Sequence, residues 1–314
     1  MKDIRGQVYM FFGFVLAGTS VISARFVTGK LGTFTVTAVS LFFAMLFLIP
    51  FCSKGLFEVR RKLTSKDCGF MLLQALFGIF LFRMFLLNGL KLTSTGEAGI
   101  LTGASPAITA ILAILLLREP VNFRKLMGIA GTVTGISLIQ GFFSSGTAFS
   151  IKHFWGNILI LCAASCESVF NIFSRVFAVK KTVHNSSRLE PTVQTLIVTA
   201  IAMVLCLVPA MFEQPMQRLH EIGPTEWLAL LWYGIFVTAL AFIFWYSGIK
   251  RCGALTAAAF SGIMPFTSML LSVVVLGESV VQRQWIGGTL IILGMVLIGS
   301  GSAARTIHTP QATQ

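Results

Sequence analysis

Three polar side chains share one face of an apolar segment near the middle of the chain. The segment runs from His153 to Ala178 and contains Glu167, Asn171 and Arg175. Their spacing of four residues places them along one stripe of an α-helix. Glu167 can carry a coupling proton and Asn171 can bind a polar ligand, while Arg175 is expected to extend to the bilayer surface. Alternatively, Glu167 and Asn171 join neighbouring helices through hydrogen bonds.

Arg83 lies within a second apolar segment, GIFLFRMFLL. Its planar guanidinium could pair with Glu167 or hold a carboxylate or phosphate of a substrate. Trp245 and Tyr246 end a third segment, FIFWYSG, where they form either an interfacial belt or a platform for a substrate. The predicted substrate-binding residues are therefore Arg83, Asn171, Glu167, Trp245 and Tyr246.

Composition indicates a helical membrane protein. The chain has 314 residues, of which 55% are hydrophobic and 11% are charged, and its mean hydropathy is +0.85. A bilayer core needs about 20 apolar residues per helix. Ten such segments are predicted, at 7–26, 33–52, 69–90, 95–117, 125–143, 155–177, 191–212, 226–249, 254–276 and 283–301.

The net charge of +13 is explained by basic residues in short loops, so the expected partner is the lipid bilayer and not nucleic acid. Sixteen of the 24 Lys and Arg residues lie on the side of the membrane that holds the N-terminus, and five lie on the other side. The positive-inside rule therefore predicts a multi-pass protein with both termini in the cytoplasm. The Cys and His residues form no ligand cluster, so no metal and no cofactor are expected.

Two long stretches match each other without a gap at an offset of 159 residues. The matched pairs include Gly89 with Gly248, Gly103 with Gly262, Pro106 with Pro265 and Glu119 with Glu278. Each half holds five predicted helices, and an odd number turns the second half upside down, as in many transporters. The predicted boundaries are 1–146 and 147–305 for the two five-helix repeats and 306–314 for a short cytoplasmic tail.

The matched prolines lie within predicted helices and remove a backbone hydrogen bond. Gly103, Pro106, Gly262 and Pro265 are therefore predicted hinges of alternating access, the alternative being static kinks. Among the loop acids, Glu97 is expected to stabilise a helix N-terminus. Glu119 and Glu278 are expected to cap the helix that follows or to pair with Arg124 and Arg283.

The repeated pattern resembles the EamA-type drug/metabolite transporters. It comprises GLK, Pro106, LRE and RKLMG in the first half and GIK, Pro265, LGE and RQWIG in the second. The resemblance covers essentially the whole chain. It implies ten helices, a central cavity, cytoplasmic termini, a bacterial inner membrane location and secondary transport of small metabolites, often amino-acid export.

The sequence thus predicts an all-α integral membrane protein with two inverted five-helix repeats. We expect it to export a small polar metabolite, such as an amino acid or a related compound, by alternating access with Glu167 as the coupling residue. A membrane-embedded enzyme, a receptor or a channel are the alternatives. An enzyme would require more than one Glu and one Asn at depth, and the sequence contains neither an output domain nor a pore loop. The sequence leaves open whether the protein forms a homodimer.

Overall fold

The computed structural model describes residues 4–62, 65–117, 122–139, 150–183, 190–260 and 263–302. Apart from one isolated bridge between Thr28 and Leu31, every regular element in these ranges is a helix. In chain order the helices are α1 (Ile4–Gly18), α2 (Ser20–Val27), α3 (Thr33–Lys62), α4 (Ser65–Ala75), the π-helix η1 (Leu76–Leu81), α5 (Phe82–Leu90), α6 (Thr95–Thr102), α7 (Ser105–Leu117), α8 (Phe123–Ile139), α9 (Ile151–Val183), α10 (Pro191–Met211), α11 (Pro215–Glu221), α12 (Pro224–Trp232), the π-helix η2 (Tyr233–Leu240), α13 (Ala241–Phe260), α14 (Ile263–Leu276) and α15 (Gln282–Ser302).

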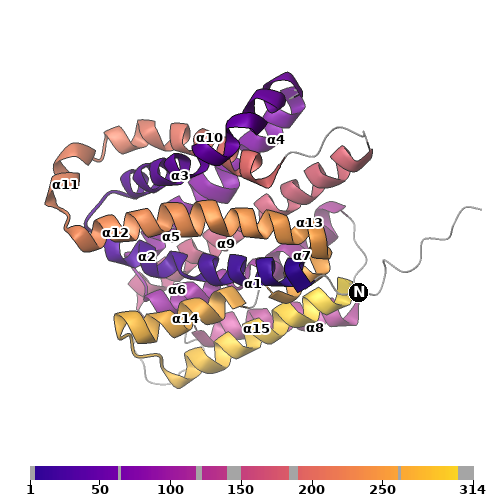
Figure 1. The fold of residues 1–314 in the computed structure, drawn as a ribbon. Coiled ribbons are helices and arrows are strands. Elements are labelled where there is room, and N and C mark those ends of the chain that lie inside the picture. Colours follow the sequence, from indigo (N-terminus) through magenta and orange to yellow (C-terminus); the bar gives the residue numbers. More distant parts are fainter. Residues whose placement is uncertain are drawn as a thin grey trace, which may run out of the picture.

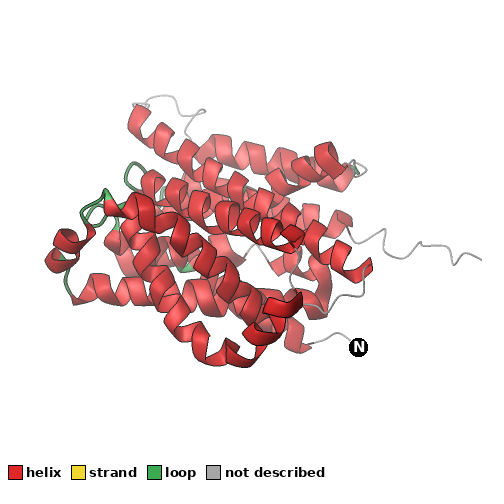
Figure 2. Cartoon of the chain, turned by 90° about the horizontal axis from the view of Figure 1, so that it is seen from above, coloured by secondary structure: helices red, strands yellow, loops and turns green. Residues whose placement is uncertain are grey.

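Most helices run along a common direction and form one bundle (Figures 1 and 2). Among the described residues, seven segments, each a single helix or consecutive helices, are long and apolar enough to cross a membrane. They are Ile4–Val27, Thr33–Cys52, Asp67–Leu90, Thr95–Leu116, Ile151–Ser174, Pro191–Met211 and Pro224–Gly248. Two shorter apolar helices cover Ile263–Leu276 and Gln282–Ile298. The predicted fifth span is represented by α8, and the predicted end of that span lies outside the described residues.

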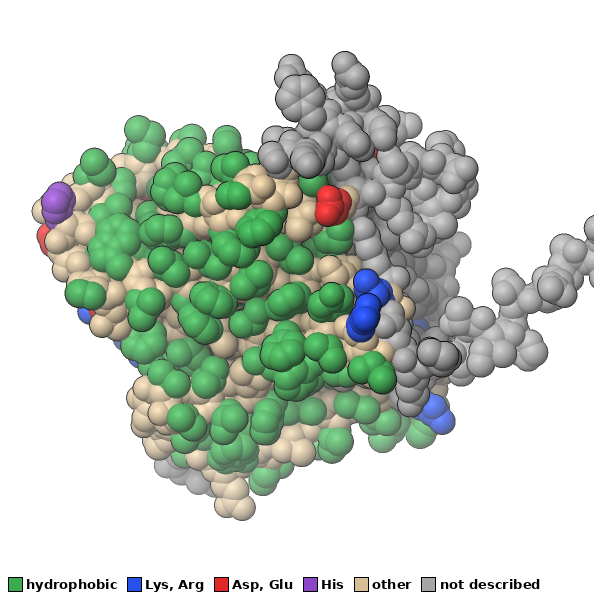
Figure 3. Space-filling view, viewed as in Figure 1, with side chains coloured by type: hydrophobic (Ala, Val, Ile, Leu, Met, Phe, Trp, Pro, Cys, Tyr) green, Lys and Arg blue, Asp and Glu red, His purple; other side chains and the backbone are tan. Residues whose placement is uncertain are grey.

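The face of the bundle shown in Figure 3 is covered mainly by hydrophobic side chains, while the coloured charged groups lie toward its edges. Large apolar side chains such as Phe42, Leu46 and Val274 are half or more exposed. A water-soluble protein of this size rarely presents such a continuous apolar surface, which suits contact with lipid chains.

The helices pair as two inverted halves require. The second helix of each half packs against its counterpart, α3 against α10, and the fifth does the same, α8 against α15. The contact of α1 with α13 in one direction corresponds to that of α9 with α5 in the other. These reciprocal pairs agree with the repeat found at an offset of 159 residues.

Four matched glycines bring α8 and α15 into backbone contact. A Cβ on Gly128 would lie 2.6 Å from the Gly294 carbonyl oxygen, and one on Gly135 would lie 2.5 Å from that of Gly287. Gly287 and Gly294 are the repeat equivalents of Gly128 and Gly135, so each contact is repeated by the pseudo-symmetry. The sequence motif formed by Gly131 and Gly135 predicts close packing here, but a Cβ on Gly131 would have only an ordinary contact at 3.6 Å.

Both repeats contain a π-helical segment at matching positions. Residues 76–81 form η1, and their repeat equivalents, residues 235–240, lie within η2. A π-helical turn shifts the register of the side chains that follow and is often found at functional sites. Arg83 follows η1 almost directly, and Tyr233 and Thr238 belong to η2.

The fourth predicted span is divided into α6 and α7, and this corrects the placement of Pro106. The chain turns tightly at Gly103 and Ala104, whose N–H groups donate to carbonyls three residues earlier. Pro106 therefore occupies the first turn of α7, where its missing N–H costs little, and is not in the middle of a helix. Pro265 likewise lies in the first turn of α14, while Gly262 lies outside the described residues.

The loop predicted between the eighth and ninth spans was wrong. Helix α13 continues through residues 250–253 to Phe260, whereas the first half has a turn after Leu90 and then begins α6 at Thr95. The Ser94 hydroxyl caps α6 by accepting the Glu97 N–H at 3.2 Å. The repeat equivalent of Ser94 is Gly253, which has no capping side chain, and the Ala-rich stretch that follows favours continued helix.

Candidate functional site

Arg83 is a buried cation whose recorded partners are neutral. Its side chain is only 5% exposed. One terminal nitrogen donates to the Ser40 hydroxyl at 2.7 Å and the other donates to the Thr238 hydroxyl at 2.5 Å. The guanidinium carbon lies 4.0 Å from the centre of the Tyr233 ring. No acidic side chain in the described part of the chain pairs with Arg83, so its positive charge is available to an anion.

The two hydroxyls are oriented as acceptors by their own hydrogen bonds. Ser40 donates to the Thr37 carbonyl at 3.0 Å, and Thr238 donates to the Tyr233 carbonyl at 2.8 Å. The second bond joins residues five apart within η2, where the π-helical register changes the backbone pairing. Because each hydroxyl hydrogen is used, the oxygen lone pairs face Arg83 and hold its guanidinium in one orientation.

Glu167 lies elsewhere in the bundle and does not pair with Arg83. It is on α9 and interacts with Ser105, the first residue of α7. Its Oε2 atom is buried and, within the described part of the chain, has no hydrogen-bond partner. The Arg83–Glu167 pair considered from sequence is therefore not formed here, because the Ser40 and Thr238 hydroxyls take up the guanidinium. Asn171 lies one turn further along α9 and is half-buried.

An aromatic cluster connects α9 with α13. The Phe170 ring lies 6.1 Å from that of Phe242 and 6.0 Å from that of Trp245, and Trp245 and Tyr246 are in edge contact at 4.9 Å. Tyr246 is only 6% exposed, and its hydroxyl has no hydrogen-bond partner among the residues that the structure describes. Such burial differs from a lipid-facing belt, and it leaves one polar atom available within an aromatic environment.

Thr238, Phe242 and Trp245 are four and three residues apart along η2 and α13. This spacing places them approximately along one side of the chain of helices. Phe170 reaches the same region from α9 and also packs where a Cβ on Gly78 would lie 2.5 Å from its ring. The cationic centre at Arg83 and the aromatic cluster are thus adjacent regions of the interface between the third, sixth and eighth spans.

Two of the predicted hinge residues, Gly103 and Pro265, lie against each other. A Cβ on Gly103 would lie 3.1 Å from the Pro265 ring and 3.0 Å from Ile291. The break after α6 therefore packs directly against the first turn of α14. A side chain at this position would crowd the Pro265 ring, the Ile291 side chain and the Ile100 carbonyl oxygen, so the site favours glycine.

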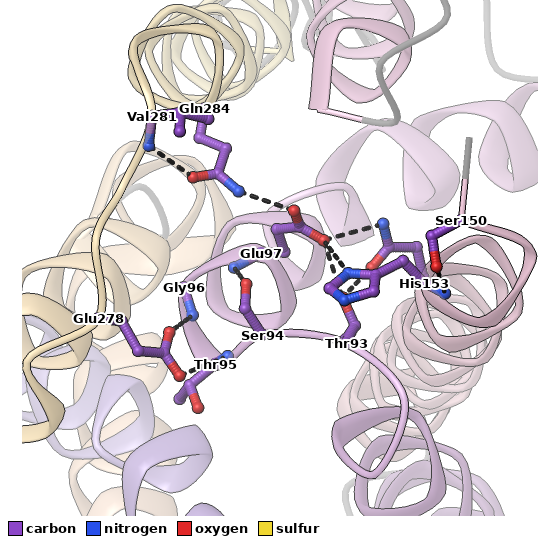
Figure 4. A network of polar contacts seen from close by, with 11 residues as sticks. Thr93, Ser94, Thr95, Gly96, Glu97, Ser150, His153, Glu278, Val281 and Gln284 are labelled. Carbon is purple, nitrogen blue, oxygen red and sulfur yellow. Dashed lines mark hydrogen bonds and ion pairs between the residues drawn. The ribbon is translucent and has the colours of Figure 1, made fainter. Parts of the chain in front are cut away.

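At the end of the bundle that carries α11 and the loops after α2, α5 and α14, polar groups join the two halves (Figure 4). We call it the outer end, after its predicted orientation. Glu278 accepts the backbone N–H groups of Thr95 and Gly96 at 3.0 and 2.8 Å. It thus caps α6 in the opposite repeat, and the predicted cap on its own following helix was wrong. Glu119 and the side chain of Arg175 lie outside the described parts.

Sequence reasoning missed the residues that surround Arg83. Tyr233 and Thr238 are five residues apart, which a search for stripes of period three or four overlooks. The internal repeat offered one signal, because the repeat equivalent of η1 is the segment that holds Thr238.

The role of Glu97 was predicted in part. It lies in the first turn of α6, but its carboxylate also contacts residues of the second half.

The family comparison agrees with this architecture. The model of the EamA-like transporter family matches residues 4–141 and 154–300. The uncharacterized transporter YetK of Bacillus subtilis is 28% identical over 297 residues, covering 94% of this chain and 86% of its own. The aromatic amino acid exporter YddG of Ancylobacter novellus is 29% identical over 201 residues, covering 63% of this chain and 64% of its own.

A solved crystal structure covers 98% of this chain and 100% of its own chain, with 22% identity and a TM-score of 0.58. That likeness shows a shared fold. The two family matches cover nearly all of both repeats and agree with the paired helices and matched glycines described above. The chain belongs to the EamA-like transporter family, and it is a multi-pass membrane transporter and not an enzyme.

Proposed function

We propose that the protein exports a small metabolite that carries a carboxylate and an apolar or aromatic side group, such as an amino acid or a related compound. Arg83 carries this proposal. A guanidinium removed from water without an acidic partner leaves an unneutralised charge, which costs several kcal/mol in a protein interior. A carboxylate can accept two parallel N–H bonds from such a group. Binding an anion would therefore offset the cost of burying Arg83.

The aromatic cluster supports the apolar part of the substrate. Phe170, Phe242 and Trp245 offer ring faces and edges in the neighbouring region, and the Tyr246 hydroxyl offers an unpartnered donor. Asn171, one turn from Glu167, can bind a further polar group. The relative YddG of Ancylobacter novellus is named an aromatic amino acid exporter, which is consistent with such a substrate.

Transport would proceed by alternating access. The two halves contact each other through Gly103 and Pro265, and rocking about this contact would expose the interior first to one side and then to the other. Glu167 would carry the coupling proton, because within the described ranges its buried Oε2 has no hydrogen-bond partner that a proton would displace.

Counterflow of candidate amino acids into proteoliposomes tests the substrate proposal. Arg83→Lys retains a positive charge but loses the planar fork, so we expect KM for a carboxylate substrate to rise at least about tenfold, the effect of losing one charge-assisted hydrogen bond. Arg218→Lys on the exposed surface of α11 is the matched control and should transport normally. Equal KM values for wild type and Arg83→Lys over every transported carboxylate would contradict the assignment of Arg83.

A further inference from the structure

A buried carboxylate joins the two repeats at the outer end. Glu97 on α6 is 7% exposed and belongs to the first half. Its Oε1 accepts the Gln284 side-chain amide at 2.7 Å, and its Oε2 accepts the Asn157 amide at 3.2 Å. Both partners belong to the second half, on α15 and α9, and both are at least nine-tenths buried. The contact is therefore an interface between the halves.

The two amides are fixed as donors toward Glu97. The Gln284 carbonyl oxygen accepts the Val281 N–H at 2.9 Å, so its NH2 group must face the carboxylate. The Asn157 oxygen contacts the Thr93 hydroxyl at 2.6 Å, and that hydroxyl lies 2.8 Å from Glu97 Oε2. An ionised carboxylate accepts only, and these partners suit it. Protonation of Oε2 would add an O–H that the Thr93 hydroxyl oxygen can accept, and Oε2 would lose the bond that it accepts from the Asn157 amide.

Water can reach this interface from the outer end. A depression of about 520 Å³ is lined by Arg25, Lys91, Thr93, Lys152, His153 and Glu278, among others. His153 Nδ1 lies 3.6 Å from Glu97 Oε2, and the His153 side chain is half-exposed. Figure 4 shows His153 and Gln284 approaching Glu97 from different directions. A proton therefore has a short route from the outer solution to the buried carboxylate.

We propose that Glu97 is a proton-binding site that opens the outer gate: the carboxylate holds the two halves together, and the protonated acid releases them. The step is the binding of one proton to one carboxylate oxygen, which then no longer accepts an amide N–H. The other charged groups near it are Arg25 on α2, Lys91 and Glu278 in neighbouring loops, Lys152 and His153 on α9, and Arg283 on α15. Glu278 is bound to the α6 N-terminus, Glu213 to the start of α3 and Glu226 to Lys30. Of these acids in the described part of the chain, Glu97 is the one held by two side-chain amides of the opposite half.

The inference rests on the proposed alternating access, but its test requires no substrate. Ser272 on α14 is fully buried and lies 3.0 Å from where a Cβ on Gly96 would be, next to the interface closed by Glu97. Ser272→Cys, in a chain whose native cysteines are replaced by serine, is treated with a membrane-impermeant thiol reagent from the outer side of proteoliposomes. We expect labelling to be slow at neutral pH and at least about tenfold faster at acidic pH.

Three variants identify the group whose protonation changes the labelling rate of Ser272→Cys. Glu97→Gln should label fast at every pH, whereas His153→Gln should keep the pH response. Glu221→Gln is the matched control, because Glu221 is an exposed outer-end acid on α11, and it should keep the wild-type pH response. If Glu97→Gln is poorly folded, Gln284→Met, which removes one donor, should raise labelling at neutral pH.

A pH response that survives in Glu97→Gln, or one that is lost in His153→Gln, would overturn the proposal. So would labelling that stays slow in all variants at all pH values. These outcomes leave counterflow untouched, whereas a protein that labels as expected but exchanges no carboxylate would contradict only the proposed function.

Discussion

Replacing Thr238 by valine removes an acceptor of Arg83 while nearly preserving the volume of the side chain. Arg83 would keep the Ser40 hydroxyl and the Tyr233 ring, but the terminal nitrogen that now donates at 2.5 Å would have no neutral partner. A hydrogen bond to a charged group contributes about 1.5–3 kcal/mol. Since 1.4 kcal/mol corresponds to a factor of ten, we expect KM for a carboxylate substrate to rise about 10- to 100-fold.

The measurement is KM in counterflow, together with the thermal midpoint of the purified protein. Thr238→Ser keeps the hydroxyl and is the matched control, so it should remain near wild type in KM. A structural role alone would lower the thermal midpoint of Thr238→Val without changing KM. Normal KM with lowered stability would therefore refute the inference that Thr238 positions Arg83 for substrate.

The other predictions concern coupling, the hinge and topology. Glu167→Gln keeps the shape of the side chain but cannot titrate, so uphill transport driven by a pH gradient should be lost while counterflow survives; uphill accumulation by the variant would make Glu167 a structural residue. Pro106→Ala adds an N–H that can bridge the break after α6, so turnover should slow with nearly unchanged substrate affinity, and normal turnover would make the break static. Cysteine at Lys152 should react with an impermeant reagent applied to intact cells and cysteine at Arg61 should not; the reverse pattern would invert the topology.

The sequence was sufficient to predict the helical membrane fold and its division into two inverted halves, because both depend on patterns that repeat along the chain. Length and hydropathy define the spans, and matched glycines such as Gly135 and Gly294 remain visible through 159 residues of separation. These features are local or periodic, so they can be recognised in the sequence without knowing which helices contact each other.

The environment of Arg83 could not be predicted in the same way. Its partners come from α3 and η2, and the register of η2 departs from that of an α-helix, so Tyr233 and Thr238 do not form a recognisable stripe. Depth alone left Arg83 two possible partners, Glu167 or a substrate anion. The first pair is not formed among the described residues, because depth does not fix which face of a helix a side chain occupies. The helix that Glu278 caps was predicted wrongly for a related reason, since this helix, α6, belongs to the other half.

The break in the fourth span lies between the attachments of two acids that are proposed to bind protons, Glu97 and Glu167. Helix α6 carries Glu97, whose partner Asn157 lies on α9. Helix α7 begins with Ser105, whose carbonyl accepts the hydroxyl of Ser168, next to Glu167 on the same α9. Between these two attachments lie the rest of α6 and the turn at Gly103 and Ala104. Release of the Glu97 attachment would free α6 from α9 while Glu278 still holds its N-terminus. Because α7 would stay on α9, the outer gate could open without disturbing the environment of Glu167. A proton on Glu97 would then control access, and a proton on Glu167 would control coupling, through separate halves of one interrupted helix.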